Sequence, residues 1–241
     1  EISTTVYDGQ NRVIATINPL GNRTTIAYDD MGRQISTTNP LGNMSQNVYD
    51  DRNLLTATID PLGNRTTHTY DAASNRIATT NPLGESSQTV YDDAGRAIAA
   101  VDPLGHRSTT TYNTASQAVA ATNPLDETST SVYDAAGRSI ASINPLGFRA
   151  TSIYDAAGRM IASENPLAER STTTYDAAGR RIARTNPLSE IDTTLYDNAG
   201  RAVAQINPLG FRSTTLYDAA GRGLATIDPL GNRSSSVYDL A

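Results

Sequence analysis

The sequence predicts an all-β fold made of tandem β-hairpins, and three regularities point to it. The tyrosines recur at one constant interval, from Tyr7 to Tyr238. Each of the 11 prolines lies twelve places after a tyrosine and precedes a leucine. The segments between these marks are rich in Thr, Ile, Val and Ser, which favour strands. A fixed period of this length is typical of repeat proteins whose units pack mainly on their neighbours. We therefore expect residues 1–241 to form a single array of about eleven 21-residue repeats.

The first element of each repeat is a predicted turn, and positions are counted here from the tyrosine as zero. In the repeat that begins at Tyr133, this turn runs from Asp134 to Gly137 and is followed by Arg138. An aspartate in first place and a glycine in fourth place are typical of a type I turn that ends in a residue with positive φ. Such a turn commonly closes a hairpin.

The second predicted turn lies at positions eleven to fourteen, Asn144 to Gly147 in the same repeat. Asparagine first, Pro145 second and glycine fourth are the preferences of a type I turn. Other repeats replace the glycine with Asp126, Ala168 or Ser189. Because such residues are costly where φ is positive, the sequence predicts that this place does not need positive φ.

The segments between the turns are predicted strands of about six and seven residues, 138–143 and 148–154 in this repeat. A proline in every repeat disfavours long helices. Eleven hairpins in a row give an antiparallel sheet of about 22 strands. Because strand twist accumulates, so wide a sheet is expected to spiral into a tube or shell. The alternative is a β-solenoid with one 21-residue coil per repeat and like strands stacked in parallel.

The predicted core of each repeat is thin. It consists of the tyrosine, an Ile or Val at position seven, the leucine after the proline and a partly apolar residue at position twenty. Burial of so few side chains does not offset the entropy of ordering a whole repeat. We therefore expect a single repeat to be unfolded and the array to be stable only through contacts between neighbours.

The composition excludes several classes of function. The chain has no cysteine, so it forms no disulfide and no thiolate metal site. Its 19 basic residues are all arginine, and 25 acidic residues give a net charge of −6. This balance argues against nucleic acid and anionic membranes as partners. No apolar run is long enough to span a bilayer, so we expect no membrane insertion. The chain begins and ends within a repeat, and we expect it to be a fragment of a longer protein.

The phrase Tyr-Asp-Ala-Ala-Gly-Arg, followed by an apolar strand and Asn-Pro-Leu-Gly, resembles the YD repeat of the RHS family. The resemblance covers the whole chain. It implies hairpins in a long strip that winds into a hollow shell, as in bacterial polymorphic toxins, insecticidal toxin-complex subunits, wall-associated proteins and animal teneurins. The conserved core region that precedes a variable toxic domain in family toxins is not recognisable here, so no self-cleavage is carried over.

Some repeats depart from the family pattern. Asn113 replaces the motif aspartate, and Leu54, Asn75 and Gln117 stand where the motif arginine is expected. Since no repeat has gained or lost a residue, one operation relates all of them, and we expect a regular tube or filament segment.

The residues that define the repeat are expected to be structural. In the representative repeat they are Tyr133, Asp134, Gly137, Arg138, Asn144, Pro145, Leu146 and Gly147. The tyrosines are expected to pack with a bonded hydroxyl, with sugar stacking as the alternative. The aspartates are expected to cap turns, with a Ca²⁺ ladder as the alternative. The arginines are expected to pair with aspartates of the same or the adjacent turn.

Candidate modification sites lie on the strands and after the second turn. Hydroxyls at positions seventeen to nineteen are candidates for O-linked glycans, and asparagines at position fifteen begin N-x-[ST] sequons. The candidates are Thr172, Thr173, Thr214, Thr215, Asn22 and Asn64, with further sequons at Asn43 and Asn232. Phe148 and Phe211 share position fifteen, and contacts between repeats or chains are one interpretation of them.

We expect no catalytic residue, cofactor or metal, because every candidate group recurs in repeat after repeat and catalysis needs a singular site. The predicted function is that of a non-enzymatic structural protein, a segment of an extracellular or cell-surface fibre, wall-associated protein or adhesin of a bacterium. Its expected partners are other copies of itself and glycans. The alternative is the wall of an RHS-type shell that encloses a secreted toxin domain.

Overall fold

The computed structural model describes residues 3–238 and divides into two compact units, Glu1–Glu127 and Thr128–Ala241. All 23 elements of the described residues are β-strands. The prediction of an all-β fold is confirmed, and the strands of five and six residues that alternate along the chain match the predicted lengths closely.

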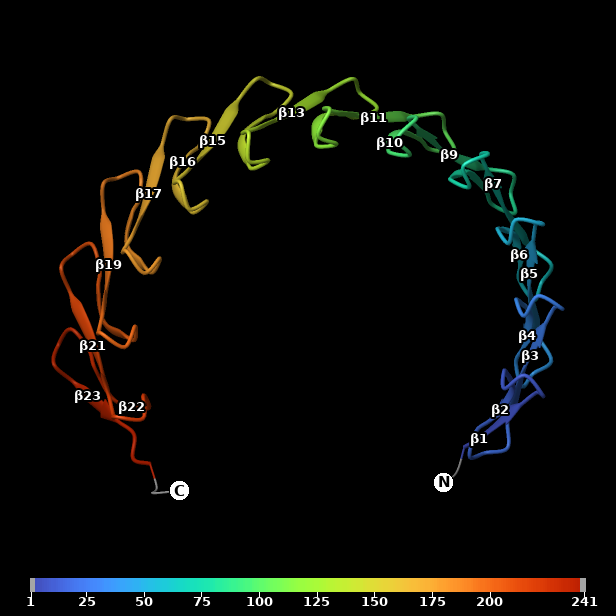
Figure 1. The fold of residues 1–241 in the computed structure, drawn as a ribbon, viewed down its shortest axis with the longest axis horizontal. Coiled ribbons are helices and arrows are strands. Elements are labelled where there is room, and N and C mark those ends of the chain that lie inside the picture. The colour runs from blue at the N-terminus through green and yellow to red at the C-terminus, as the bar shows by residue number, and fades with distance from the viewer. Residues whose placement is uncertain (1–2, 239–241) are drawn as a thin grey trace. The chain divides into compact units, whose positions relative to one another are not determined.

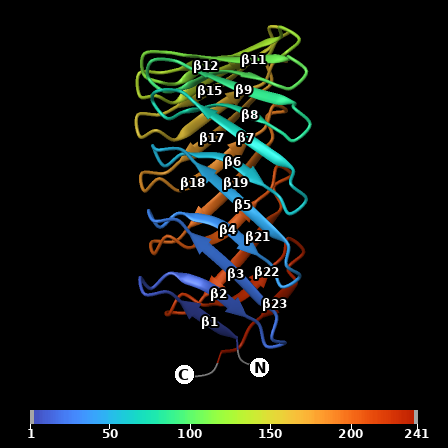
Figure 2. The same ribbon diagram turned by 90° about the vertical axis from the view of Figure 1, so that its right-hand side faces the viewer.

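The first unit contains twelve strands, ordered along the chain without a crossover (Figure 1, blue to green). They are β1 (Thr4–Tyr7), β2 (Val13–Ile17), β3 (Arg23–Tyr28), β4 (Gln34–Thr38), β5 (Met44–Tyr49), β6 (Leu55–Ile59), β7 (Arg65–Tyr70), β8 (Arg76–Thr80), β9 (Ser86–Tyr91), β10 (Ala97–Val101), β11 (Arg107–Tyr112) and β12 (Ala118–Thr122). Figure 2 shows the blue strands of this unit crossing their strip obliquely between two rows of turns.

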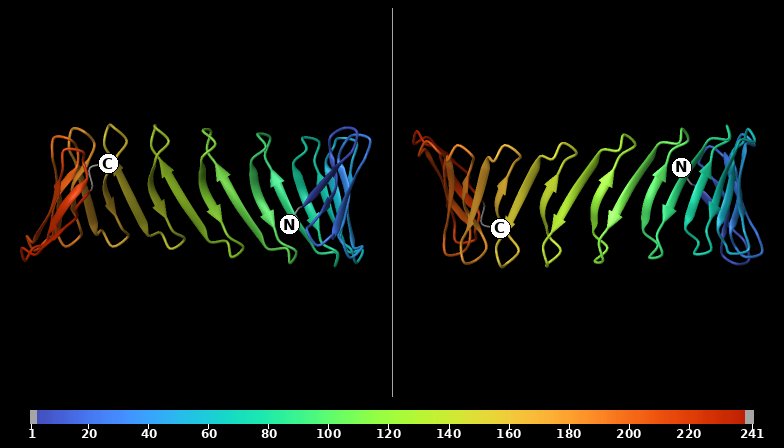
Figure 3. Two further views of the ribbon diagram at one scale, coloured as in Figure 1. Left: turned by 90° about the horizontal axis from the view of Figure 1, so that it is seen from below. Right: turned by 90° about the horizontal axis from the view of Figure 1, so that it is seen from above.

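The second unit contains eleven strands in the same arrangement, and Figure 3 shows its hairpins with one row of turns at each edge. They are β13 (Thr128–Tyr133), β14 (Ser139–Ile143), β15 (Arg149–Tyr154), β16 (Met160–Glu164), β17 (Arg170–Tyr175), β18 (Arg181–Thr185), β19 (Ile191–Tyr196), β20 (Ala202–Ile206), β21 (Arg212–Tyr217), β22 (Gly223–Ile227) and β23 (Arg233–Ser235).

Within each unit every strand pairs antiparallel with the next strand along the chain. This pairing overturns the alternative of a β-solenoid, which needs parallel neighbours. The register repeats from hairpin to hairpin: Ala141 lies opposite Val132 on one side and Thr151 on the other. Ile140 is an extra residue opposite Tyr133, a β-bulge that recurs beside each tyrosine that ends a strand and adds to the twist of the hairpin.

The first turn has the predicted geometry. The N–H of Gly137 donates to the carbonyl of Asp134 at 3.0 Å, and the N–H of Asp134 donates to the carbonyl of Arg138 at 3.0 Å. Gly137 has a φ of 81°, so it supplies the left-handed residue that matches a type I turn to the twist of the strands. Asn and Ser hold this place in other repeats with φ between 61° and 69°: Asn11, Asn53, Ser74 and Ser116.

The second turn is the same turn, and the prediction that it avoids positive φ was wrong. Gly147 has a φ of 83°, and its N–H donates to the carbonyl of Asn144 at 2.9 Å. Asp126, Ala168 and Ser189 also have positive φ, at 61° to 65°. The two hydrogen bonds that close the hairpin require the left-handed residue, and they hold even Ala168 in that conformation despite its Cβ.

The core is a row of alanines. The buried side chains of the described residues are all alanines at position eight, with 0–4% of their surface exposed: Ala15, Ala57, Ala99, Ala141, Ala162, Ala204 and Ala225. Among residues 3–238 no second layer covers the sheet within either unit, so only a side chain flanked by two neighbouring strands is enclosed. The core is thin, as predicted.

The leucines that follow the prolines were predicted to join the core, and this was wrong. Leu146 is 78% exposed, and its equivalents in the other repeats are 76–87% exposed. Leucine holds the third place of the turn, beyond the ends of both strands, where no neighbouring strand reaches it. Its backbone N–H is nevertheless engaged, because it donates to the side-chain oxygen of Asn144 at 3.1 Å.

Candidate functional site: an arginine clamp between hairpins

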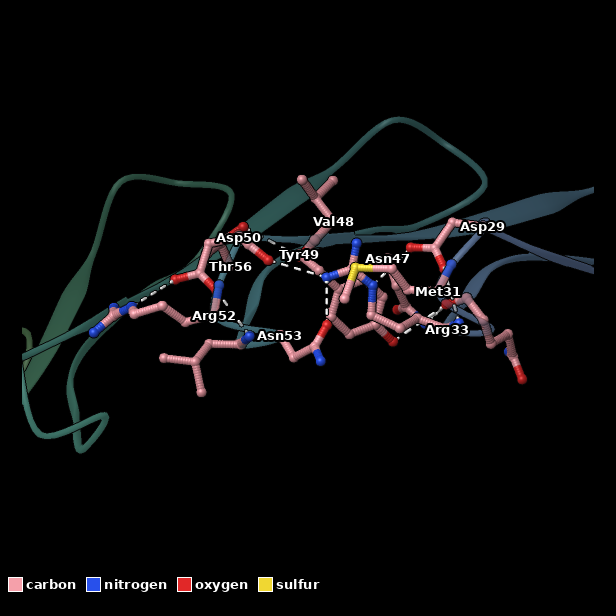
Figure 4. Close-up of polar contacts among 12 residues, drawn as sticks. Asp29, Met31, Arg33, Asn47, Val48, Tyr49, Asp50, Arg52, Asn53 and Thr56 are labelled. Carbon is pink, nitrogen blue, oxygen red and sulfur yellow. Dashed lines mark hydrogen bonds and ion pairs between the residues drawn. The ribbon is translucent and has the colours of Figure 1, made fainter.

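One set of contacts links each hairpin to the next, and Figure 4 shows it around Arg33. The Nε of Arg33 donates to Oδ2 of Asp29, in its own turn, at 2.6 Å. Its Nη1 donates to the carbonyl of Asp50 at 3.0 Å and to Oδ1 of Asn53 at 2.8 Å, and both of these residues lie in the first turn of the next repeat. Its guanidinium lies 4.9 Å from the ring centroid of Tyr49. We call this set of contacts the arginine clamp. It consists of the arginine at position five, the aspartate of the same turn, and the tyrosine and first turn of the next repeat.

The clamp recurs with nearly constant geometry. Arg159 contacts Asp155 through Nε at 2.7 Å and Nη2 at 2.6 Å, and it lies 4.7 Å from the ring centroid of Tyr175. Cation–π contact occurs at 4.7–4.9 Å wherever the arginine is present among the described residues. These arginines are Arg12, Arg33, Arg96, Arg138, Arg159, Arg180, Arg201 and Arg222. A half-buried guanidinium on an aromatic ring is favourable by about 0.5–2 kcal/mol.

The tyrosine hydroxyl makes a second link to the preceding hairpin. The hydroxyl of Tyr175 donates to the carbonyl of Met160 at 3.2 Å, and that of Tyr154 donates to the carbonyl of Ser139 at 3.1 Å. Tyr154 and Tyr175 are thus each fixed at the ring by an arginine and at the hydroxyl by a backbone carbonyl. One ring face is covered, which disfavours sugar stacking there.

The turn aspartates use both carboxylate oxygens. Oδ1 of Asp134 accepts the N–H groups of Ala136 and Arg138, and Oδ2 accepts the guanidinium of Arg138. The hydrogen bond from the N–H of Arg138, followed by that from its guanidinium, lowers the pKa of Asp134 below its ordinary value. These contacts engage the lone pairs that a calcium ion would need, and the described residues contain no group of three or more His, Asp or Glu that could hold a metal ion.

Three repeats of the first unit lack the arginine, at Leu54, Asn75 and Gln117, and the first two differ from each other. In the repeat with Leu54, the neighbouring Arg52 substitutes for the clamp arginine. Arg52 contacts Asp50 at 3.3 Å and donates from Nη1 to the carbonyl of Asp71 at 2.8 Å. At Asn75 the side-chain amide donates to Oδ2 of its own Asp71 at 3.0 Å. The turn is therefore capped there, but the next ring carries no arginine.

The remaining predicted residues lie away from the clamp. Pro145 and Leu146 are exposed at the opposite edge of the strip. Oδ1 of Asn144 accepts the N–H of Phe148 at 2.9 Å, so this asparagine caps the second turn. The two phenylalanines, Phe148 and Phe211, are each 50% exposed.

The candidate glycosylation residues differ in access. The four threonines of β17 and β21 are half-buried within their strands: Thr172, Thr173, Thr214 and Thr215. Asn22 and Asn64 are exposed after the second turn, but Nδ2 of Asn64 donates to Oδ2 of Asp60 at 2.7 Å.

Sequence reasoning missed the tyrosine of the clamp. It paired the arginine with an aspartate of the same or the adjacent turn but did not find the tyrosine, which belongs to the next repeat, as Arg138 and Tyr154 show. The constant spacing of these two residues was the available signal. Arg52 takes over from the arginine that is missing at Leu54, and this was also visible in the sequence, because Arg52 lies two places before position five.

The family model named RHS Repeat matches residues 7–44, 49–86 and 154–191. Each match begins at a tyrosine and spans hairpins of the kind described above. These three segments of the chain therefore contain RHS repeats. The predicted resemblance is confirmed, and the 21-residue repeats outside these matches carry the same two turns.

Solved structures to which this chain is similar include two that contain TccC3. One is TcdB2-TccC3 without its hypervariable C-terminal region, at 15% identity and a TM-score of 0.35, over 93% of this chain and 19% of that one. The other is the Tc holotoxin pore of Photorhabdus luminescens with a mutated TccC3, at 15% identity and a TM-score of 0.35, over 94% of this chain and 18% of that one. This chain therefore spans about a fifth of the length of either neighbour.

A search of curated proteins gives no match to this sequence. Among residues 3–238 there is no helix with the length and apolarity that crossing a membrane requires.

Proposed function

We propose that this chain is a non-enzymatic architectural segment, a strip of RHS hairpins in the wall of an extracellular or cell-surface fibre of a bacterium. The observation that carries the proposal is the uniformity of the repeats. The same two turns close each hairpin, and every repeat has the same length. Identical units related by one repeated operation generate an open helical assembly.

The distribution of chemistry along the chain also supports an architectural role. The polar groups of the clamp are engaged with one another and recur in repeat after repeat. A catalytic site needs groups that are brought together once and left available to a substrate. The contacts between repeats are short in sequence range, which suits a strip that extends by adding units.

A second candidate function is the wall of a hollow shell that encloses a secreted toxin domain. The three matches to the RHS Repeat model favour it, because the family resemblance implies such shells. Under this proposal the partner is a domain outside these residues, and the strip shields it.

Electron microscopy of the purified chain, and of two copies joined in register, distinguishes these functions. For a fibre segment, we expect elongated particles of constant width that become longer when the second copy is added. Closed particles of fixed diameter with a central cavity would contradict the fibre and support the shell. Antibodies against the chain should label intact, unpermeabilised cells of the source bacterium, and labelling only after permeabilisation would contradict the cell-surface location.

A further inference from the structure

One place in the first unit has the geometry of an arginine clamp without its arginine. Asn75 holds the position of the clamp arginine, and Tyr91 is the tyrosine on which that arginine would lie. In the part of the chain that the structure describes, no cation lies over the ring of Tyr91, whereas eight equivalent rings carry one. Arg52, which replaces the missing arginine at Leu54, donates to the carbonyl of Asp71, one hairpin earlier.

The missing side chain leaves space. A pocket of about 810 Å³ lies between Asn75 and Tyr91. The equivalent pockets measure about 420 Å³ beside Arg138 and Tyr154, and about 300 Å³ beside Arg180 and Tyr196.

A second measure agrees that this space is open. A Cβ added to Gly179 would meet Nη1 of Arg159 at 3.4 Å, and one added to Gly200 would meet Nη1 of Arg180 at 3.4 Å. A Cβ added to Gly95, in the turn that follows Asn75, would meet no heavy atom within 4 Å. Beside Gly95, therefore, no side chain lies where the clamp guanidinium lies beside Gly179 and Gly200.

The groups around the pocket suit a cation. Asp71, Asp92 and Asp93 line it. Asp92 is paired with Arg96 at 2.6 Å, but neither Asp71 nor Asp93 has an ion pair among the described residues. Tyr91 lines the pocket, and the carbonyl of Asp92 holds the place that accepts Nη1 of the arginine in a complete clamp, as the carbonyl of Asp155 does for Arg138. A planar guanidinium fits a carbonyl, a carboxylate and a ring face together better than a compact ammonium does.

We propose that this pocket is a docking site for an arginine side chain of a partner protein, which completes the clamp in trans. The chain itself supplies the argument for this occupant, because the same surroundings hold an arginine guanidinium in eight other repeats. The docked arginine lies over Tyr91, donates to the carbonyl of Asp92 and neutralises Asp71 or Asp93. This site breaks the equivalence of the repeats and gives the strip a distinct attachment point.

The test is an NMR titration of the isotopically labelled chain with N-acetyl-arginine amide, followed at the backbone amides of Tyr91 and Asp92. We expect saturable shifts, with citrulline and lysine analogues binding at least about tenfold more weakly, because they lack the charge or the planar fork. A short neutral peptide with one central arginine should bind at least as tightly as the amide. Exclusion of that peptide would overturn the partner-protein occupant, and equal binding of the citrulline or lysine analogue would overturn the guanidinium site.

Two matched variants decide the location. Asn75→Arg fills the pocket from within and should weaken binding at Tyr91 at least about tenfold. Arg159→Asn copies Asn75 in the second unit and should create a new site, seen as shifts at Tyr175 and Asp176. The absence of saturable shifts in the wild-type chain, or unchanged binding in Asn75→Arg, would overturn the proposal. An Arg159→Asn variant that gains no site would also overturn it, because loss of the clamp arginine would then not be sufficient to create an arginine-binding site.

Discussion

The hairpins of residues 154–196, in the second unit, and those of residues 49–91, in the first, have the same turns but different links between neighbours. In the second unit, Arg159 and Arg180 each reach from their own aspartate to the next tyrosine. In the first unit, Arg52 substitutes for one arginine and Asn75 caps its turn without reaching Tyr91. Closure of a hairpin therefore depends on the aspartate, whereas connection between hairpins depends on the arginine. The two functions of the motif are separable, and four measurements can test that separation.

Acidification should have the largest effect, because it removes every clamp at once. Hydrogen bonds from Arg180, first from its N–H and then from its guanidinium, lower the pKa of Asp176 in the folded chain, and Asp134 behaves in the same way with Arg138. The unfolded chain then binds more protons than the folded chain at low pH. The stabilisation is present above the unfolded pKa of about 3.9 and is lost as the pH falls through the lower folded values. Urea midpoints followed by circular dichroism should fall steeply below about pH 4.

A matched control for acidification replaces Asp by Asn at four clamps of the second unit. Asn113 shows that asparagine caps this turn, since its Oδ1 accepts the N–H of Gln117 at 3.0 Å. The variant with D134N, D155N, D176N and D197N should fold with a smaller dependence on pH. An unchanged pH dependence would show that the acid-sensitive groups lie elsewhere.

Truncation of the tyrosine should distinguish the clamped hairpin from the open one. Tyr175→Ala removes a half-buried ring, its contact with Arg159 and its hydroxyl bond. We expect a loss of about 2–3 kcal/mol from these three contributions. Tyr91→Ala removes a ring without a cation and a longer hydroxyl bond of 3.4 Å. We expect this loss to be smaller by about 1 kcal/mol. Urea unfolding of both variants gives the comparison, and equal losses would mean that the cation adds nothing.

Removal of the arginine should loosen contacts between hairpins without opening the turn. Arg159→Ala removes an ion pair and a cation–π contact. We expect it to cost about 1 kcal/mol, mostly through the cation–π contact. Arg52→Ala should cost less, because Arg52 makes a longer ion pair of 3.3 Å at a more exposed site. Hydrogen exchange should increase between β15 and β17 in Arg159→Ala, while the turn amide of Gly158 stays protected. Exposure of Gly158 would show that the arginine also closes the turn.

The smallest expected effect concerns the second turn. Because the turn closes its own hairpin and the arginine connects neighbouring hairpins, a substitution in this turn should change only the stability of its own hairpin. Ala168 has a φ of 61°, which strains an alanine. Ala168→Gly should relieve this strain and stabilise the chain by about 0.5–1 kcal/mol. Gly147→Ala, the reverse change in an equivalent turn, should destabilise it by a similar amount. Thermal unfolding measures both, and a destabilised Ala168→Gly would contradict the assignment of strain to this residue.

Much of the fold could be predicted because its determinants are local. A turn aspartate, a left-handed residue at position four and a fixed spacing define each hairpin, and Asn113 or Ser74 can be recognised as variants of the same chemistry. The second turn was misread because Ala168 suggested freedom from positive φ. Its backbone hydrogen bonds with Asn165 and between Asn165 and Glu169 outweigh the preference of alanine, and no single residue reveals that balance.

The sequence by itself determined the period, the strand and turn alternation and the turn caps, because these depend on residues close to one another along the chain. Only the tertiary structure decided that alanine at position eight is covered while Leu146 is bare, and that Arg138 crosses to Tyr154. It also decided that the position vacated at Asn75 remains open over Tyr91. These outcomes depend on the register between successive strands, which places residues from different hairpins side by side.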